Sequence, residues 1–223
     1  MSTTKTKRLA HSLMQGLNPN DETIEAYNRK IAKYIQNTPA WYNESHKPLL
    51  KWIDFNLSLV PNNGRILEIG SGPGRDAKYM KEKGYPVICS DASFAFVNYL
   101  EHIGERAFLF NPLRDEIAKR YHMVFANAVV PHFTSQDFRL VLGKIHRALT
   151  DDGIFAFSAK QGEGEVWTDE KLGDRRYVYH WHPDDLLKFV QEAGYETTYL
   201  KHSIPGDLPT HTWILITAKK VSS

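Results

Sequence analysis

The sequence predicts one α/β domain built on a mostly parallel β-sheet with helices on both faces. From residue 65 onward, short apolar runs typical of buried strands alternate with segments whose apolar residues recur every three or four positions. The last two apolar runs, 196–204 and 213–219, are separated only by a loop that contains proline and glycine, which indicates an antiparallel pair. The 223 residues are enough for one such domain with a sizeable core.

Two helices are expected before the sheet begins. In 21–36, Asp21 can cap a helix whose apolar residues share one face, and 45–60 carries a second set of apolar residues at helical spacing. The turn "PNNG" at 61–64 ends this part of the chain. The predicted organisation is a flexible tail at 1–20, a helical cap at 21–60 and the sheet domain at 61–220.

Seven strands with intervening helices are expected in the sheet domain. One helix begins at Thr134, which stands three residues before Asp137 at the spacing of a capping box, and the turn "DDG" at 151–153 separates this helix from the next strand. In chain order, the expected strands are 65–70, 86–91, 107–111, 123–130, 154–160, 196–204 and 213–219, and the expected helices are 75–83, 93–102, 134–149 and 182–194.

Composition and charge are those of an ordinary globular protein. Charged residues make up 24% of the chain, and a net charge of +2 is too small to indicate a nucleic-acid partner. Cys89 is the single cysteine, which fits a reducing compartment, and no apolar run approaches the roughly 20 residues that span a bilayer. We interpret the basic, Ser/Thr-rich start as a tail rather than an organellar transit peptide, and we expect a cytoplasmic protein without a membrane segment.

The stretch "ILEIGSGPGRD" at 66–76 is the strongest candidate for a ligand site. Three glycines at alternate positions follow an apolar strand, so that a ligand can approach the backbone closely. A P-loop would need a Lys-Ser/Thr pair where this loop continues into Arg75 and Asp76. The dinucleotide fingerprint would need a small residue at the position of Arg75, so neither phosphate-binding interpretation fits.

Two carboxylates indicate a different ligand. Glu68 precedes the loop by two residues; its charge would repel a pyrophosphate but can anchor an ammonium group. Asp91 ends the next strand, 21 residues beyond Gly70, where a carboxylate can accept both hydroxyls of a ribose. S-adenosylmethionine has an ammonium group at one end, a ribose towards the other and no phosphate between them.

With these residues the sequence resembles the class I S-adenosylmethionine-dependent methyltransferases over about residues 22–220. "LEIGSGPG" resembles their first motif, "CSDAS" their ribose-binding strand end, and the last two strands their usual hairpin. The resemblance implies a Rossmann-like, seven-stranded, mostly parallel sheet whose last strand is antiparallel. It also implies a cofactor site that contains Tyr34, Glu68, Gly70, Ser71, Gly72, Gly74, Asp91, Ala92, Ser93, Asn111, Leu113, Asn127 and Ala128.

Asn111 departs from the pattern of the family. Many members have an aspartate there, which accepts a hydrogen bond from the adenine amino group. An asparagine oxygen can accept the same bond without the charge, and Leu113 would then form a wall of the adenine site.

The acceptor side of the site is less well defined by the sequence. Methyl transfer from a sulfonium depends on alignment, and a base is needed only for an acceptor that must lose a proton. In the family a histidine often follows the fourth strand, so His132 is a candidate base for an oxygen or nitrogen acceptor, or else a positioning or packing residue. Asn127-Ala128 does not match the N/D-P-P-Y/F turn of amine- and amide-methylating enzymes, and Cys89 lies on the wrong strand for a pyrimidine carbon-5 nucleophile.

The segment 158–181 is expected to be a charged, aromatic loop. Its glycines at 162 and 164 would let it close over a polar substrate, unless its charges simply pair with one another in solvent. The "KQGEGE" stretch within it resembles one found in a group of bacterial methyltransferase-domain proteins. Candidate catalytic or substrate residues in this segment are Lys160, Glu163 and Tyr179, with Glu165, Arg175, Arg176 and Tyr177 beside them.

Three functions remain open from the sequence. The first is methylation of an oxygen or nitrogen atom of a small polar molecule. The second is a tRNA wobble-uridine-type methyltransferase, which the start "AYNRKIAKYI" resembles and whose RNA could bind basic residues. The third is a catalytically silent cofactor-binding scaffold subunit. The ten histidines form no cluster with ligand-like spacing, so no metal is expected. The basic residues for RNA would be Lys5, Lys7, Arg8, Lys78, Lys81 and Lys83.

Overall fold

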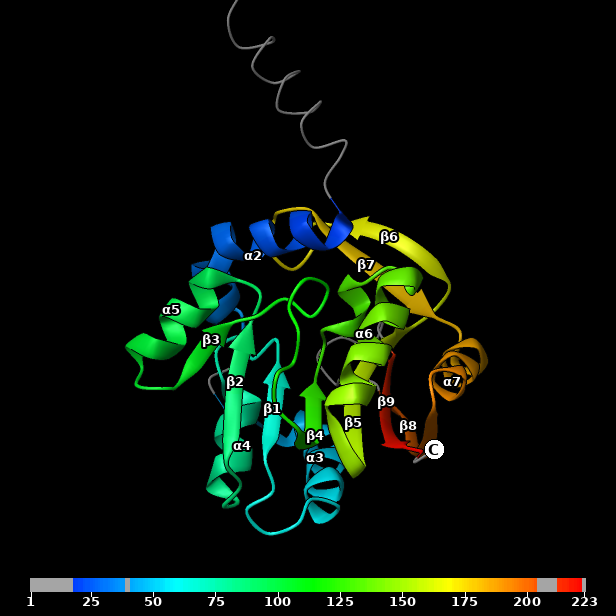
Figure 1. The fold of residues 1–223 in the computed structure, drawn as a ribbon. Helices are drawn as coiled ribbons and strands as arrows, with labels where there is room; N and C mark the ends of the chain where they lie inside the picture. The colour runs from blue at the N-terminus through cyan, green and yellow to red at the C-terminus, as the bar shows by residue number, and fades with distance from the viewer. Residues whose placement is uncertain (1–17, 39–40, 204–211, 222–223) are drawn as a thin grey trace, which may run out of the picture.

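The computed structural model describes residues 18–38, 41–203 and 212–221. Most of the predicted tail and the whole of the predicted loop at 205–211 lie outside these residues. The described residues form one mixed sheet of nine strands with helices on both faces (Figure 1). The predicted α/β class, parallel strand order and antiparallel last strand are confirmed.

The strand order places the first strand of the sheet at its centre. The order is β3-β2-β1-β4-β5, and all of these neighbours are parallel. Antiparallel β9 pairs with the other edge of β5, and β8 pairs with β9. These seven strands are Ala107–Leu109 (β3), Val87–Asp91 (β2), Ile66–Ile69 (β1), Tyr121–Ala126 (β4), Leu149–Gln161 (β5), Trp213–Lys220 (β9) and Tyr195–Ser203 (β8).

Eight helices of at least three residues flank the sheet within the described ranges, two of them 3-10 helices. Pro19–Gln36 (α2) and Lys47–Ser58 (α3) are the two predicted before the sheet, with the 3-10 turn Glu44–His46 (η1) leading into the second. The others are Arg75–Glu82 (α4), Phe94–His102 (α5), Val130–His132 (η2), Ser135–Ala148 (α6) and Pro183–Glu192 (α7).

The predicted loop at 158–181 is wrong, because this segment contains a β-hairpin. Strands Gly164–Thr168 (β6) and Arg176–Trp181 (β7) pair antiparallel, and β7 joins β5 in parallel at its last two residues. Strand β5 continues four residues past Phe157, where its pairing with β4 ends, and so leaves a free edge. The hairpin covers that edge, which a charged and aromatic composition alone does not reveal.

Several element boundaries differ from the prediction, and three of these differences have a clear local cause. Helix α2 begins at Pro19, because the side chain of Asn18 rather than Asp21 caps it by accepting from the backbone N–H of Asn20. Strand β4 ends at Ala126, because the chain turns sharply at Ala128, where φ is +60°. The expected turn at 151–153 lies within β5, where the pairing with β4 shifts register as the chain bulges.

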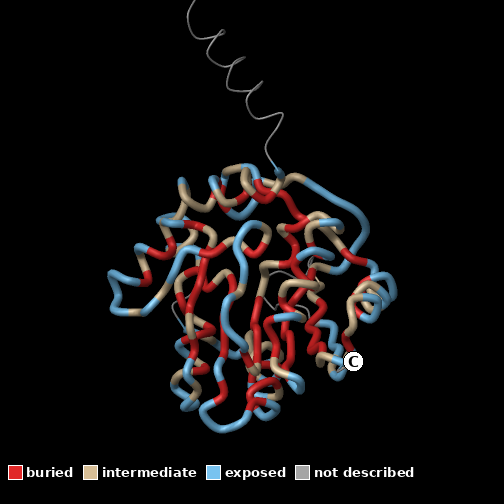
Figure 2. The backbone as a smooth tube through the Cα atoms, viewed as in Figure 1, coloured by how far each residue is buried: buried red, intermediate tan, exposed pale blue. Residues whose placement is uncertain are grey.

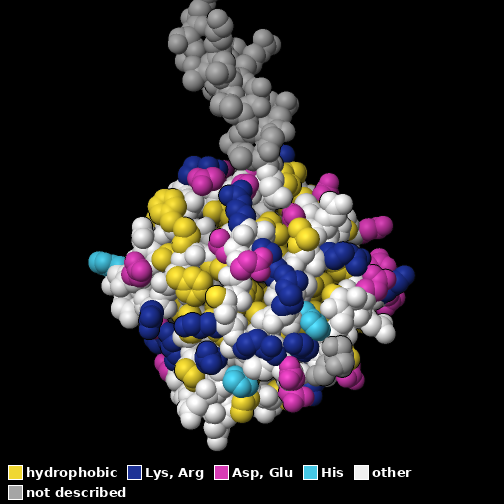
Figure 3. Space-filling model, in the orientation of Figure 1, with side chains coloured by type: hydrophobic (Ala, Val, Ile, Leu, Met, Phe, Trp, Pro, Cys, Tyr) yellow, Lys and Arg dark blue, Asp and Glu magenta, His cyan; other side chains and the backbone are white. Residues whose placement is uncertain are grey.

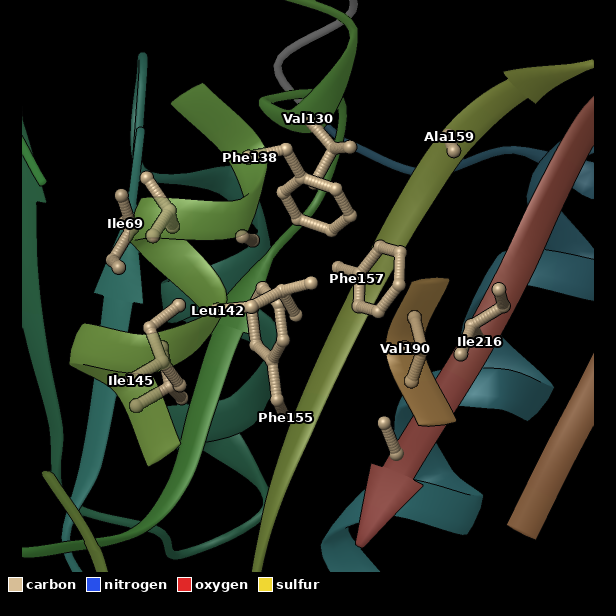
Figure 4. Packing of buried hydrophobic residues seen from close by; sticks show 14 of the residues in the cluster. Ile69, Val130, Phe138, Leu142, Ile145, Phe155, Phe157, Ala159, Val190 and Ile216 are labelled. Carbon is tan, nitrogen blue, oxygen red and sulfur yellow. The ribbon is translucent and has the colours of Figure 1, made fainter. Parts of the chain in front are cut away.

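Alternate residues of the central strands pack into two separate cores. One core lies between β4, β5 and helices α6 and α7; Figure 4 shows Phe155 and Phe157 of β5 against Phe138 and Leu142 of α6. The other lies on the opposite face beneath α3, α4 and α5. Figure 2 shows the resulting pattern, with buried strands inside and exposed residues on the loops and outer helix surfaces.

The two N-terminal helices occupy different places. Helix α3 packs against the sheet, with the Trp52 indole donating to the hydroxyl of Thr217 in β9 at 3.2 Å. Helix α2 lies across the carboxyl ends of the parallel strands, at the upper end of the sheet in Figure 1. The carboxyl ends of parallel strands are where ligands bind in open α/β sheets, next to the point where the strand order reverses. Here that point lies between β1 and β4, beneath α2.

No helix among the described residues is long and apolar enough to cross a membrane.

Truncating a side chain at the centre of the larger core should lower the free energy of unfolding far more than truncating an exposed side chain on the helix that covers this core. Phe157→Ala removes a fully buried ring from its contacts with Phe138 and Phe155, and we expect a loss of about 3–5 kcal/mol in the free energy of unfolding. Leu140→Ala, at a position 60% exposed on α6, should change it by less than about 0.5 kcal/mol. Urea denaturation measures both; equal losses would contradict the assigned core.

Candidate functional site

A cavity of about 440 Å³ lies above the carboxyl ends of the parallel strands, with α2 over it. Its lining follows the strand order from β3 through β2, β1, β4 and β5 to β7. Ten of the predicted site residues line this cavity: Tyr34, Gly70, Gly72, Asp91, Ala92, Asn111, Asn127, Ala128, His132 and Lys160.

Polar side chains of α2 attach it to the rest of the cavity wall. Asn20 accepts from the amide of Asn111 at 3.1 Å, after β3. Thr23 accepts from the backbone N–H of Tyr177 in β7 at 2.9 Å. Asn28 accepts from the hydroxyl of Ser93 at 2.7 Å, after β2. The sequence prediction used only the apolar stripe of this helix and missed these buried polar contacts.

The glycine loop has the backbone that its sequence predicts. Gly70, Gly72 and Gly74 have φ values of +69°, +52° and +81°, in the region that favours glycine. A Cβ at Gly70 would overlap Val129, and a Cβ at Gly74 would lie 2.7 Å from Leu100. Gly72 faces the cavity instead, with the ring of Tyr34 the nearest group at 4.0 Å from its missing Cβ. The loop thus offers bare backbone to a ligand.

Asp91 ties the glycine loop to the end of β2. One carboxylate oxygen accepts from the N–H of Gly72 at 2.9 Å and the other from the N–H of Ser93 at 2.8 Å. Burial raises the pKa of Asp91 to about 6, while these backbone donors lower it. Each oxygen keeps a lone pair for a ligand hydroxyl, since a carboxylate can accept about four hydrogen bonds.

Ser93 lies outside the cavity lining. It is the N-cap of α5, where its hydroxyl accepts from the N–H of Phe96 and donates to Asn28. Ala92 lines the cavity as predicted.

Glu68 lies beneath the glycine loop rather than on the cavity wall. It is 2% exposed, and its Oε2 atom has no hydrogen-bond partner. Burial, together with the charge of Asp76, raises the pKa of Glu68 well above its ordinary value, which a hydrogen bond with Ser71 opposes. Ser71, also outside the lining, is bonded to Ser90 and so holds the loop against β2. The charge of Lys81 also opposes the rise in this pKa, but Glu68 forms no ion pair among the described residues.

Asp76 is a site residue that the sequence analysis missed. Its carboxylate accepts from the hydroxyl of Tyr42 and, at 2.8 Å, from the amide of Asn127. The other end of the Asn127 amide accepts from Ser158, whose oxygen accepts from the N–H of Ala128. This network holds Ala128 in its left-handed conformation, which costs a non-glycine residue energy and is often found at functional sites.

The β3 end of the cavity is mainly apolar, with the amides of Asn20 and Asn111 beside it. Phe96, Phe110 and Pro112 line it, and sequence reasoning missed all three. Asn111 lines the cavity as predicted, but its oxygen already accepts from the N–H of Leu113 at 3.0 Å, so one lone pair remains for a ligand. Leu113 itself packs against the core and does not line the cavity.

His132 belongs to a fully paired chain of hydrogen bonds. Its Nδ1 atom lies 2.8 Å from the carbonyl oxygen of Tyr177 and its Nε2 atom 3.0 Å from the hydroxyl of Tyr27. A carbonyl oxygen only accepts, so Nδ1 carries the proton and Nε2 accepts from Tyr27. Burial, followed by the charge of Arg176, lowers the pKa of His132 to about 3. The imidazole therefore stays neutral at physiological pH.

The Tyr27 hydroxyl stands between His132 and a guanidinium group. It donates to His132 and accepts from Nη1 of Arg176 at 3.2 Å. A phenolic oxygen has two acceptor positions, so one remains, and Tyr27 lines the cavity. Tyr27 lies on the first predicted helix, whose sequence pattern shows only that its apolar residues share one face.

Glu163 and Tyr179 do not line the cavity. Side chains of a strand alternate between its two faces, and in β7 Arg176 and Val178 line the cavity. Tyr179 points the other way, with its ring 4.7 Å from that of Trp181. Glu163 is exposed between β5 and β6.

The other candidates of this segment are divided in the same way. Lys160 and Arg176 line the cavity. Tyr177 directs its hydroxyl to Glu165 at 2.7 Å, away from the cavity, and Arg175 is exposed over Trp167.

The basic residues considered for RNA do not form a free patch where the structure describes them. Lys81 forms an ion pair with Glu105 and Lys83 one with Asp54, while Lys78 lies over an indole ring. Figure 3 shows lysines and arginines sharing one face with acidic and apolar side chains. The remaining three, Lys5, Lys7 and Arg8, lie outside the described residues.

The described part of the chain contains no group of three or more His, Cys, Asp or Glu residues placed to hold a metal ion.

A family model and several solved structures match this chain. Residues 40–200 match the model of the family described as "Methyltransferase domain". A comparison with curated proteins gave no match.

Several solved structures share the fold at low sequence identity. DhpI, solved as a complex with SAH, has a TM-score of 0.71 at 14% identity over 92% of this chain and 98% of its own. The 1,6-didemethyltoxoflavin-N1-methyltransferase of Burkholderia thailandensis, solved with its substrate and S-adenosylhomocysteine, has a TM-score of 0.65 at 18% identity over 80% and 79%. The glycopeptide N-methyltransferase MtfA, solved with S-adenosylmethionine, has a TM-score of 0.63 at 13% identity over 77% and 93%.

Two glycine substitutions separate backbone strain from crowding in the loop. Gly70 and Gly84 both have positive φ, but a Cβ at Gly84 would have nothing within 4 Å. We expect Gly84→Ala to cost about 1–2 kcal/mol of stability through backbone strain alone. Gly70→Ala should cost about 1–3 kcal/mol more, because the new methyl overlaps Val129. Thermal unfolding of both variants measures the difference. Equal losses of stability would show that the Val129 side chain moves aside without an energetic cost.

Proposed function

The chain belongs to the methyltransferase-domain family, and on that premise we propose that it transfers the methyl group of S-adenosylmethionine to an oxygen or nitrogen atom of a small polar molecule. In this proposal residues 61–220 form the cofactor-binding domain. The helices of 21–60 are additions to it, with α2 over the cavity and α3 against the sheet.

The observation that carries the proposal is one cavity with two chemically different ends. The end above β3, β2 and β1 has apolar walls, a bare glycine loop and Asp91. The end above β5 and β7 has Tyr27, His132 and basic side chains. A methyl donor and its acceptor must meet in one space that excludes water, and this arrangement provides it.

The residues present fit the cofactor. The Oε2 atom of Glu68 is a buried acceptor without a hydrogen-bond partner, towards which the ammonium group would lie from above the loop. Asp91 would hold the ribose hydroxyls, and Phe96, Phe110 and Pro112 the adenine. Tyr34 would cover the ligand at Gly72. Bound S-adenosylmethionine supplies an electrophilic methyl group on a sulfonium.

We assign Tyr27 as the residue that orients the acceptor. Its hydroxyl hydrogen is directed to His132, Arg176 occupies one acceptor position, and the remaining position can accept from an O–H or N–H group. This preference for a donor supports an oxygen or nitrogen acceptor over a thioether or a carbon.

His132 acts in this proposal as a positioning residue rather than a base. Its pKa of about 3 means that it accepts a hydrogen bond, and not a proton, at neutral pH. Held by the Tyr177 carbonyl, it fixes the direction of the Tyr27 hydroxyl.

Binding of the cofactor tests the proposal directly. Calorimetry should give micromolar dissociation constants for S-adenosylmethionine and S-adenosylhomocysteine, on the order of −8 kcal/mol in free energy. Binding should be lost in Gly72→Arg, which fills the loop's open face, and weakened in Asp91→Ala. Gly84→Arg is the control, because its side chain enters open space away from the cavity. Binding of NADH in place of these ligands would overturn the proposal.

Removing the Tyr27 hydroxyl should reduce turnover without affecting the cofactor. Tyr27→Phe keeps the ring against Tyr34 and Phe96 but loses the hydrogen bond to the acceptor. We expect kcat/KM to fall about 10- to 100-fold, the worth of one such bond, with unchanged affinity for S-adenosylhomocysteine. A homocysteine-release assay over a panel of hydroxyl and amine acceptors measures this, with Tyr99→Phe on α5 as the control. Unaltered turnover in Tyr27→Phe would show that the Tyr27 hydroxyl does not orient the acceptor.

A further inference from the structure

Arg176 is a buried cation in the wall of the cavity. It is 6% exposed and lines the cavity, and within the described residues its guanidinium forms no ion pair. Its Nη1 atom donates to Tyr27, but its buried Nε atom has no hydrogen-bond partner. Its neighbour Arg175 differs in each respect, being exposed and 3.9 Å from the carboxylate of Glu22.

Further positive charge lies towards the same end of the cavity. Lys160 and Lys171 both line the cavity; Lys171 is exposed over the ring of Tyr34, between the two ends, and its charge lowers the pKa of His132. Burial lowers the pKa of Lys160, and the charges of Arg176 and Lys171 lower it further. Glu170 is the acidic side chain that lines this end among the described residues, so cations outnumber anions by three to one.

Such an arrangement is unfavourable until an anion arrives. A buried charge without a partner costs free energy, and like charges close together add to that cost. A guanidinium with free N–H groups matches the paired oxygens of a carboxylate or a phosphate better than any uncharged ligand.

The position of Arg176 separates it from the cofactor end. It stands on β7, whereas the glycine loop follows β1, and β4 and β5 lie between them. Its direct contact is Tyr27, the residue assigned to the acceptor.

We infer that the methyl acceptor is a small molecule that carries an oxyanion group, of the carboxylate or phosphate type, which binds to Arg176 while the accepting atom lies at Tyr27. This inference rests on the proposed function. Lys160 and Lys171 add long-range attraction for the anion, and Arg176 selects its position. The oxyanion group serves only to bind the acceptor, and it is separate from the atom that Tyr27 orients and that receives the methyl group.

Simple anions test the inference without knowledge of the full substrate. The melting temperature of the protein saturated with S-adenosylhomocysteine is measured against rising concentrations of inorganic phosphate, of acetate and of uncharged acetamide, at constant ionic strength. The dose dependence gives a dissociation constant for each probe. We expect phosphate or acetate, and not acetamide, to bind the wild type, and the tighter of the two identifies the type of oxyanion.

Arg176→Gln should weaken anion binding at least about tenfold, the scale of one charge-assisted hydrogen bond. Arg176→Lys, which keeps the charge but loses the fork, should weaken it less. Arg175→Gln is the matched control and should bind as the wild type does. Because Arg176 forms no ion pair among the described residues, the ligand-free Arg176→Gln protein should melt no lower than the wild type, whereas a structural role would lower its melting temperature.

Three results would overturn the inference. The first is equal anion binding by the wild type and Arg176→Gln, and the second is no anion binding by the wild type at all. The third is a loss of S-adenosylhomocysteine affinity in Arg176→Gln, since Arg176 would then serve the cofactor's own carboxylate. Failure of the wild type to bind S-adenosylhomocysteine would instead contradict the proposed function, and the anion titrations without that ligand would still decide the role of Arg176.

Discussion

The pairing of β1 with β2 on one side and β4 on the other is the constraint on which the site depends. Parallel strands in register end at one edge of the sheet, so the segments that follow them meet there although they are far apart in sequence. Asp91 then reaches the N–H of Gly72, and Asn127 reaches Asp76. These hydrogen bonds require a register that places Glu68 beside Cys89 and Phe125.

The second constraint is the length of β5. Because this strand continues beyond its pairing with β4, β7 can join it there, and β7 brings two groups to the cavity. The carbonyl of Tyr177 sets the tautomer of His132, and the side chain of Arg176 reaches Tyr27. Helix α2 closes the arrangement from above, since its polar side chains bond to segments that follow β2 and β3 and to β7 itself. The acceptor end thus exists only when three separate segments are assembled.

The two ends of the cavity differ in the sign of their charge. Under the cofactor end lie Glu68, Asp76 and Asp91, and towards the acceptor end lie Lys160, Lys171 and Arg176. Each set contains one buried polar atom without a hydrogen-bond partner among the described residues, Oε2 of Glu68 and Nε of Arg176. In the proposed function, a cationic donor and an anionic acceptor would each neutralise the end that it enters, and opposite charges would bring them together.

The sequence by itself determined the sheet class, the glycine loop and the acids at the ends of β1 and β2, because these depend on local patterns: apolar periodicity, positive φ and spacing along one β-α-β unit. It also singled out His132 and Lys160, which line the cavity, because His132 closely follows a predicted strand and Lys160 ends one. The tertiary structure alone decided the rest. Only the pairing of β7 with β5 directs Arg176 into the cavity and Tyr179 away from it. The register of a strand with its neighbour decides which of its two faces points to the cavity. Only the crossing of α2 over the sheet converts Tyr27 from a residue of an apolar stripe into the link between His132 and Arg176, since those hydrogen bonds join positions more than 100 residues apart.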